Sequence, residues 1–177
     1  MRREEGFTTI ELLVAFTIMV TIGGAITSSI VYTARTTEAS NNHMTAVQQV
    51  QNAGYWIARD AQMADTIIVD NATPTDWLIM TWLEWDYGGN NSVTHWAVYS
   101  FDSLSDGIGI IRRNYWSSTG ATSQTLVAKY IYYDLSDPAN TSQGSYTYPD
   151  LAFRLASRFD NASETREFKV GVRPNLY

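Results

Sequence analysis

Residues 6–34 read GFTTIELLVAFTIMVTIGGAITSSIVYTA, and this stretch decides how the chain is built. Its 23 residues from Leu12 to Ala34 carry no charged side chain. A helix of that length spans roughly 34 Å, which is enough to cross a bilayer core of about 30 Å. The threonine, serine and glycine residues within it allow neighbouring helices to approach closely in apolar surroundings. The stretch therefore predicts a membrane-anchoring helix that can also pack against other helices.

The flanks of this stretch differ from those of a general secretory signal. A secretory signal is cut after its apolar part, at small residues. Here a short charged leader, residues 1–6, ends at Gly6 before the apolar part begins. One acidic residue, Glu11, stands near the start of the predicted membrane helix. A carboxylate in that position is costly unless it is paired, so Glu11 needs a partner.

The run GFTTIELLVA at residues 6–15 resembles the prepilin signal of bacterial type IV pilins and type II secretion pseudopilins. In that family a membrane aspartyl peptidase cuts after the glycine and methylates the new N-terminus. The resemblance therefore implies cleavage between Gly6 and Phe7, followed by N-methylation of Phe7. It also implies that Glu11, at the fifth mature position, is the acidic residue used in assembly. A plain membrane anchor is the alternative.

A physical account of Glu11 agrees with this resemblance. Cleavage would leave an α-amino group on Phe7 that is mostly positive at neutral pH, and Glu11 would lie one helical turn away. The carboxylate could neutralise that amine in its own chain or in a neighbouring subunit, and a filament core of low dielectric favours such pairing. The simpler interpretation is that Glu11 stabilises the helix start through the macrodipole.

The helical pattern continues beyond the apolar stretch. Apolar residues recur at alternating spacings of three and four, and polar residues, Arg59 and Asp60 among them, fill the other positions. The apolar stripe consists of Val47, Val50, Gly54, Ile57, Ala61, Ala64 and Ile68. Because no proline precedes Pro74, we expect one helix from about residue 7 to about residue 65, with the stripe of its second half packed on a sheet.

After Ile68 the period changes to two, and aromatic and β-branched residues dominate. The expected strands are Trp77–Trp85, Thr94–Phe101, Ile108–Trp116, Leu126–Leu135, Leu151–Arg158 and Glu167–Arg173. We therefore predict an α+β chain with the pilin fold, in which an antiparallel sheet packs on the C-terminal half of the long helix. Its expected parts are a cleaved leader at residues 1–6, an apolar helix at 7–34 and a globular domain at 35–177.

A second, looser resemblance concerns residues 56–64, 96–101 and 110–113. They are similar to J-type pseudopilins and the corresponding large minor pilins. In those proteins an Arg-Asp pair closes the long helix, and a tyrosine-containing strand is followed by an arginine-ended one. The matching residues here are Arg59-Asp60, Tyr99 and Arg112-Arg113. This resemblance leaves open whether the chain is a main filament subunit or a tip or priming subunit.

The composition narrows the range of functions. A hydrophobic content of 45% is too high for a disordered chain. The net charge of −6, without a basic tract, argues against general nucleic-acid binding, which needs clustered Lys and Arg. The doublet Arg112-Arg113 is interpreted as a solvated strand end. The chain has no cysteine, which excludes disulfides, thiolate nucleophiles and Cys-rich metal sites.

The sequence offers no arrangement of nucleophile, base and acid, so we expect no catalytic residue, no enzyme activity and no cofactor. Asp102 and Asp106 lie in an acidic turn that is a candidate calcium site. Their spacing does not match an EF-hand, and a solvated turn is the ordinary interpretation. Glycosylation sequons in expected loops, a pattern that also arises by chance, begin at Asn71, Asn90, Asn140 and Asn161.

These features predict a structural subunit of an extracellular type IV pilus-like filament, a helical polymer built through the N-terminal helix. The alternative is a minor pilin or J-type pseudopilin that assists assembly in a type II secretion or DNA-uptake system. A membrane-tethered binding module is a third hypothesis. The expected partners are further copies of the chain, other pilins, the prepilin peptidase and the inner-membrane assembly platform. The precursor would lie in the inner or cytoplasmic membrane and the mature chain in a filament at the cell surface.

Overall fold

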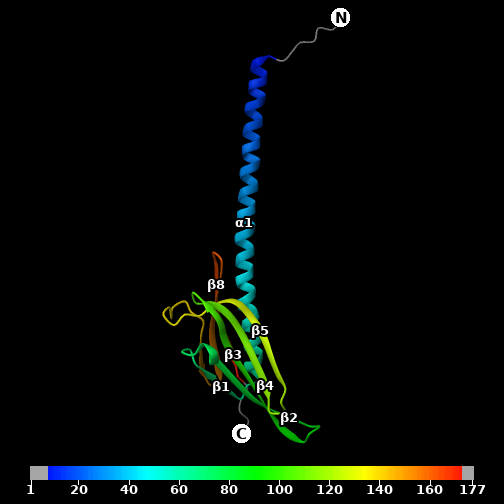
Figure 1. Ribbon diagram of the computed structural model, residues 1–177, viewed down its shortest axis with the longest axis vertical. Helices are drawn as coiled ribbons and strands as arrows, with labels where there is room; N and C mark the ends of the chain where they lie inside the picture. Colours follow the sequence, from blue (N-terminus) through cyan, green and yellow to red (C-terminus); the bar gives the residue numbers. More distant parts are fainter. Residues whose placement is uncertain (1–7, 173–177) are drawn as a thin grey trace. The chain divides into compact units, whose positions relative to one another are not determined.

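The computed structural model describes residues 8–172, in which one long helix precedes eight strands (Figure 1). The contacts within the chain divide it into two units, and the division falls between Asn41 and Asn42. The first unit contains the apolar part of the helix. The second contains the rest of the helix together with all of the strands. The predicted α+β architecture, with an antiparallel sheet packed on the second half of a long helix, is confirmed.

The helix α1, Thr9–Met63, ends where the chain enters the sheet. The amide of Asp65 donates to the Thr81 carbonyl at 2.8 Å, and the Asp65 carboxylate accepts a hydrogen bond from the Leu83 amide at 2.8 Å. The four residues that follow, Thr-Ile-Ile-Val, are all β-branched and form strand β1, Thr66–Val69. Ile68, which we expected on the helical stripe, therefore lies in a strand, and its side chain is exposed.

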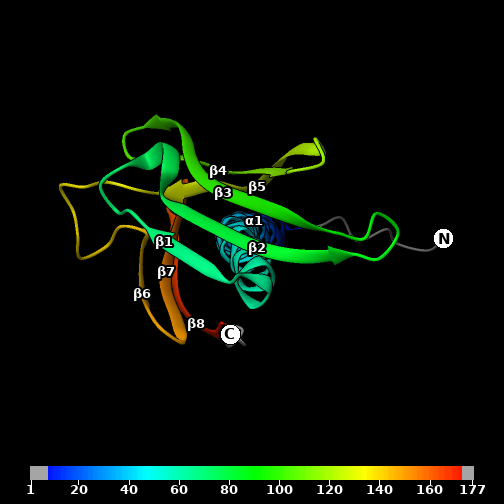
Figure 2. The same ribbon diagram turned by 90° about the horizontal axis from the view of Figure 1, so that it is seen from below.

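The strands form one antiparallel sheet with the order β1-β2-β3-β4-β5-β7-β6, and β8 pairs with the other edge of β7. A short 3-10 helix, Pro74–Asp76, connects β1 to β2. The other strands are β2 Leu78–Asp86, β3 Asn91–Ser105, β4 Ile108–Ser117, β5 Thr122–Tyr132, β6 Gln143–Thr147, β7 Asp150–Phe159 and β8 Ala162–Gly171. Seen from below in Figure 2, the sheet curls around the end of α1.

Each of the six strands expected from the sequence overlaps an observed strand, whereas β1 and β6 were not expected. Ile68 of β1 also fits the end of the helical stripe, because so short a run with three apolar residues is compatible with either period. The β6 sequence, Gln-Gly-Ser-Tyr-Thr, carries no alternating apolar pattern. It forms a strand because it pairs with β7 in a regular register, from Gln143 opposite Arg154 to Thr147 opposite Asp150.

Two side-chain amides of α1 form hydrogen bonds with the backbone of β5, where its pairing with β7 is interrupted. β5 pairs with β7 only at Ile131 opposite Ser157. The Asn52 side chain of α1 donates to the Val127 carbonyl at 2.5 Å. The neighbouring Gln49 side chain accepts from the Lys129 amide at 2.8 Å. These two helix residues satisfy backbone groups that would otherwise lack a partner, and they tie α1 to β5.

The second half of α1 buries one face against the sheet. The helix residues that are buried are Ala46, Val50, Ala53, Gly54, Ile57, Asp60 and Ala61. The sheet side of the core is formed mainly by large side chains, among them Leu78, Met80, Tyr99, Phe101, Ile111, Leu151 and Leu155. Because most of the helix residues are small, the large residues of the strands can approach the helix backbone closely.

Gly54 makes the closest of these approaches possible. A Cβ atom at this position would overlap the ring of Phe168 on β8, which stacks on Phe153 of β7 with ring centroids 5.0 Å apart. Overpacking in a core costs about 1–3 kcal/mol, whereas glycine-to-alanine in a helix gains about 1 kcal/mol. We expect Gly54→Ala to lower the free energy of unfolding of the full chain, measured by denaturant titration in detergent.

The control for this prediction is the same substitution in a chain carrying Phe168→Ala. Removal of the ring leaves only the helix propensity, so Gly54→Ala should then raise the free energy of unfolding by about 1 kcal/mol. An effect of the same sign in both chains would show that the contact with Phe168 does not explain the glycine.

Candidate functional site

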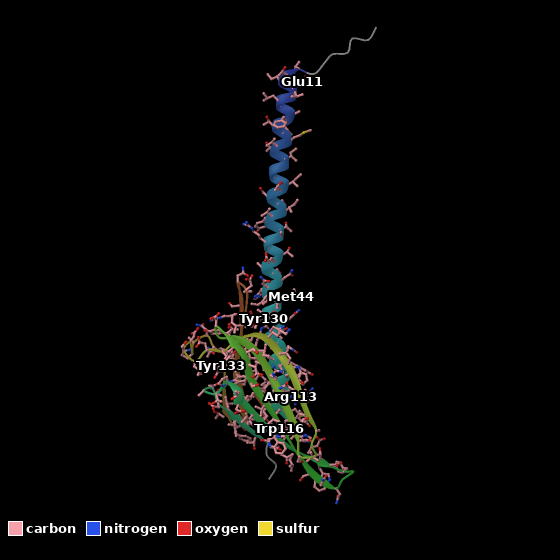
Figure 3. The ribbon with its side chains drawn as sticks, viewed as in Figure 1. Glu11, Met44, Arg113, Trp116, Tyr130 and Tyr133 are labelled. Carbon is pink, nitrogen blue, oxygen red and sulfur yellow. The ribbon has the colours of Figure 1, made fainter. Side chains whose placement is uncertain are left out.

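The first turn of α1, where Figure 3 labels Glu11, is closed by reciprocal hydrogen bonds between Thr8 and Glu11. The Glu11 carboxylate accepts from the Thr8 amide and from the Thr8 hydroxyl, each at 2.9 Å. In return, the Glu11 amide donates to the Thr8 hydroxyl oxygen at 3.4 Å. This arrangement is a capping box, which satisfies backbone donors that a helix start leaves unpaired. Glu11 thus stabilises the helix start while its side chain remains exposed.

The part of α1 that follows presents apolar side chains on all sides. Each large apolar residue from Ile10 to Tyr32 has an exposed fraction of 45% or more. These residues are Ile10, Leu12, Leu13, Val14, Phe16, Ile18, Met19, Val20, Ile22, Ile26, Ile30, Val31 and Tyr32. A helix that is apolar all round needs either a membrane or other protein around it. By length and composition α1 can cross a membrane.

Threonine hydroxyls in this segment are satisfied within the helix. Thr17 donates to the Leu13 carbonyl at 2.8 Å, and Thr21 donates to the Thr17 carbonyl at 2.8 Å. Thr27 donates to the Gly23 carbonyl at 2.9 Å. A hydroxyl bonded four residues back places no unpaired donor in apolar surroundings. The segment can therefore enter lipid or pack on other helices without leaving these three hydroxyl donors unpaired.

Gly6 and Phe7, the residues of the expected cleavage and methylation site, lie outside the described residues. The expected pairing of Glu11 with the amine of Phe7 falls there as well and stays a prediction. What the described residues add is the geometry of Glu11 in the first turn, where its carboxylate already accepts from Thr8.

A buried ion pair joins the end of α1 to the middle of the sheet. Arg113 on β4 donates through Nε to Asp60 Oδ2 and through Nη2 to Asp60 Oδ1, the latter at 3.2 Å (Figure 3). Tyr99 on β3 donates its hydroxyl to Asp60 Oδ2 at 2.7 Å. The side chain of Asp60 is fully buried and that of Arg113 is 6% exposed. Three segments distant in sequence therefore meet at one carboxylate.

Two sequence interpretations are wrong at this site. The sequence predicts Asp60 on the polar face of α1 and the doublet Arg112-Arg113 at a solvated strand end, yet Asp60 and Arg113 are buried. Successive residues of a strand point to opposite faces, so Arg112 turns outward to Asp102 at 2.7 Å while Arg113 turns inward. The signal that pointed here was the resemblance of Arg59-Asp60, Tyr99 and Arg112-Arg113 to J-type pseudopilins.

The surroundings of Asp60 favour a charged Arg113 beside a neutral Tyr99. Burial, and then the neighbouring Asp60 carboxylate, raise the pKa of Tyr99, so the phenol remains a hydrogen-bond donor. Burial works against the charge on Arg113, but hydrogen bonding and attraction to Asp60 outweigh it and raise the Arg113 pKa. The guanidinium also lies 5.6 Å from the ring centre of Trp56 and 5.0 Å from that of Tyr115, within the range of cation–π attraction.

Asp102 and Asp106, the two carboxylates of the candidate calcium turn, differ in their surroundings. Asp102 is paired with Arg112, and Asp106 lies in the turn between β3 and β4 with a φ of 51°. Among residues 8–172, no group of three or more His, Cys, Asp or Glu side chains is placed to hold a metal ion.

The four sequon asparagines all lie in turns. Asn71 has a structural role, since its side chain bonds both the amide and the carbonyl of Gly144 on β6, at 2.8 and 2.7 Å. Asn140 donates to the Asp137 carboxylate, and Asn161 accepts from Asn42 at 3.4 Å. Asn90 adopts a φ of 51° in the β2–β3 turn. Glycosylation at any of them stays a prediction.

Comparison with protein-family models, with curated proteins and with solved structures finds no match to this chain. The class of protein is therefore defined by the structure. Residues 8–172 form an α+β chain of pilin-like architecture, in which the helix α1 is long and apolar enough to cross a membrane and continues into the core of an antiparallel sheet.

Proposed function

We propose that the chain is a subunit of a type IV pilus-like filament, and that it polymerises through its apolar helix after cleavage between Gly6 and Phe7. The observation that carries this proposal is the apolar segment of α1, whose large side chains are exposed on every side from Ile10 to Tyr32. Burial is worth about 25 cal/mol for each Å² of apolar surface, so this segment gains much from lipid or from neighbouring helices. In the precursor this segment would be surrounded by lipid. In the filament the helices of neighbouring subunits would take the place of the lipid.

The prepilin-like residues 6–15 suggest how processing allows the helix to pass from the membrane into a filament. Removal of residues 1–6 takes away two arginines and two glutamates, and so removes charges that hold the N-terminus at the membrane surface. The new amine on Phe7 then has one carboxylate nearby, that of Glu11. Pairing of this amine with Glu11 of a neighbouring subunit fixes the axial register of the helices, because an unpaired charge in an apolar core is costly.

A second candidate function within the same class is a minor pilin or J-type pseudopilin with a role in assembly. The observation that favours it is the buried ion pair, because the residues that resemble this subset in sequence, Asp60, Tyr99 and Arg113, meet at one point in the fold. A minor subunit would share the apolar helix and the processing site. It would differ in its abundance within the filament.

The test is mass spectrometry of filaments sheared from the surface of cells that produce the chain. We expect a subunit that begins at N-methyl-Phe7 and lacks residues 1–6. The share of this chain separates the two candidates, since a main subunit makes up nearly all of the filament and a minor subunit a small fraction. A surface-exposed chain that retains residues 1–6 and is missing from every filament preparation would overturn both.

A further inference from the structure

The outer face of the sheet carries a polar relay that has no part in the core or in the apolar helix. Arg112 on β4 donates through Nε to Asp102 at 2.7 Å and through Nη1 to the Gln124 side-chain oxygen at 3.0 Å. Gln124 Nε2 in turn donates to Asn114 Oδ1 at 2.8 Å. Each planar group in the relay is therefore oriented by the one before it. The last member, Asn114, has its donor nitrogen turned away from Gln124.

An aromatic platform adjoins the end of this relay. Trp116 lies two residues beyond Asn114 on the same face of β4, directly opposite Trp96 on β3. The two indole rings stack with centroids 6.1 Å apart and planes 13° apart. Trp116, which is labelled in Figure 3, has an exposed fraction of 36%. A stacked partner fixes the orientation of its ring, so the exposed part of the ring offers a rigid apolar surface.

The platform and the end of the relay border one shallow hollow of about 440 Å³, between the ends of β4 and β5. It is lined by Asn114, Tyr115, Trp116, Thr122, Ser123 and Gln124. Asn114, Trp116, Thr122 and Gln124 share the outer face of the two strands and supply one indole ring, two amides and one hydroxyl, all uncharged groups, whereas Tyr115 and Ser123 alternate to the inner face, where the Tyr115 ring packs beside Arg113. The nearest charge in the relay, on Arg112, is already neutralised by Asp102.

We propose that this hollow binds a neutral carbohydrate. A pyranose ring has an apolar face of C–H groups and a rim of hydroxyls that both donate and accept hydrogen bonds. An exposed indole fits the apolar face, and the amide and hydroxyl groups of Asn114, Gln124 and Thr122 fit the rim. A pocket that combines aromatic surface with a few oriented polar groups is the usual composition of a small-molecule site. The uncharged lining selects a neutral sugar over an anionic or cationic ligand, because charges in this hollow would lose hydration without gaining a partner.

The test is binding of the full chain, in a detergent without a sugar headgroup, to an array of neutral oligosaccharides built from glucose, galactose, mannose and N-acetylglucosamine. We expect saturable binding to at least one of them, with little dependence on salt. Trp116→Ala should weaken it by about tenfold or more, and Asn114→Ala should weaken it severalfold. The matched control is Trp85→Ala, which removes an exposed tryptophan outside the hollow and should leave binding unchanged.

Fluorescence-monitored unfolding of each variant shows whether the domain is still folded. We expect the Trp116→Ala variant to remain folded, because Trp116 lies at the surface. Absence of binding to every neutral oligosaccharide overturns the proposal. Binding restricted to charged glycans, or binding weakened equally by Trp85→Ala and Trp116→Ala, overturns it as well. The result is independent of filament assembly, because it is measured on the isolated chain.

Discussion

Replacement of Glu11 by glutamine is expected to reduce incorporation of the chain into surface filaments by about tenfold or more, although glutamine preserves the capping box. The physical reason is that an α-amine on Phe7 would lose its carboxylate partner in apolar surroundings, where an unpaired buried charge costs several kcal/mol. Incorporation is measured as the share of the chain that appears in the sheared filament fraction rather than in the membrane fraction, by immunoblotting.

Two further variants separate the charge of Glu11 from its capping role. Thr8→Ala removes the hydroxyl that closes the capping box but keeps the carboxylate, and loss of a cap costs only about 0.5–2 kcal/mol. Thr8→Ala should therefore incorporate nearly as well as the unmodified chain, and Glu11→Ala should resemble Glu11→Gln. If Thr8→Ala and Glu11→Ala fail equally while Glu11→Gln assembles, Glu11 acts in this chain only as a helix cap.

Replacement of Asp60 by asparagine is expected to lower the free energy of unfolding of the sheet domain by about 3–5 kcal/mol, because it leaves the buried Arg113 guanidinium without a countercharge. It also weakens the hydrogen bond that Tyr99 donates. The measurement is denaturant unfolding of the full chain in detergent, followed by tryptophan fluorescence. Trp56, whose ring lies beside the Arg113 guanidinium, reports on this part of the core.

The matched control is Asp102→Asn. It breaks the ion pair that the adjacent arginine, Arg112, makes on the other face of the same strand, where both side chains are 31% exposed. A pair that remains in contact with water contributes about 0–1 kcal/mol, so this variant should be nearly as stable as the unmodified chain. Equal effects of Asp60→Asn and Asp102→Asn would contradict the structural role assigned to the buried pair.

A double variant distinguishes a lost interaction from a stranded charge. Asp60→Leu with Arg113→Met removes both charges and keeps apolar volume in the core. Such replacements are often neutral or stabilising, so the double variant should recover most of the stability that Asp60→Asn loses. Stability as low as in the single variant would show that the hydrogen bonds at Asp60 matter more than its charge.

The sequence by itself determined the helix and its division into an apolar part and an amphipathic part. These properties depend on neighbouring residues alone: 23 uncharged positions from Leu12 to Ala34, a stripe with a period near 3.6 and the absence of proline before Pro74. The six longer strands followed for the same reason, since their alternation and turn residues are local signals. The candidate role of Glu11 likewise came from its position in a short run of residues.

Only the tertiary structure decided which polar residues are buried and where the shortest strands form. Asp60 and Arg113 are 53 positions apart in sequence, and neither carries a local sign of burial. Each of these two charged side chains is stable in the core only because the fold places its oppositely charged partner beside it. β6 likewise exists through its pairing with β7, and Asn71 is fixed by Gly144, 73 positions away. Local patterns set the elements of this chain, whereas its charge pairs and its sheet edges were set by contacts between distant segments.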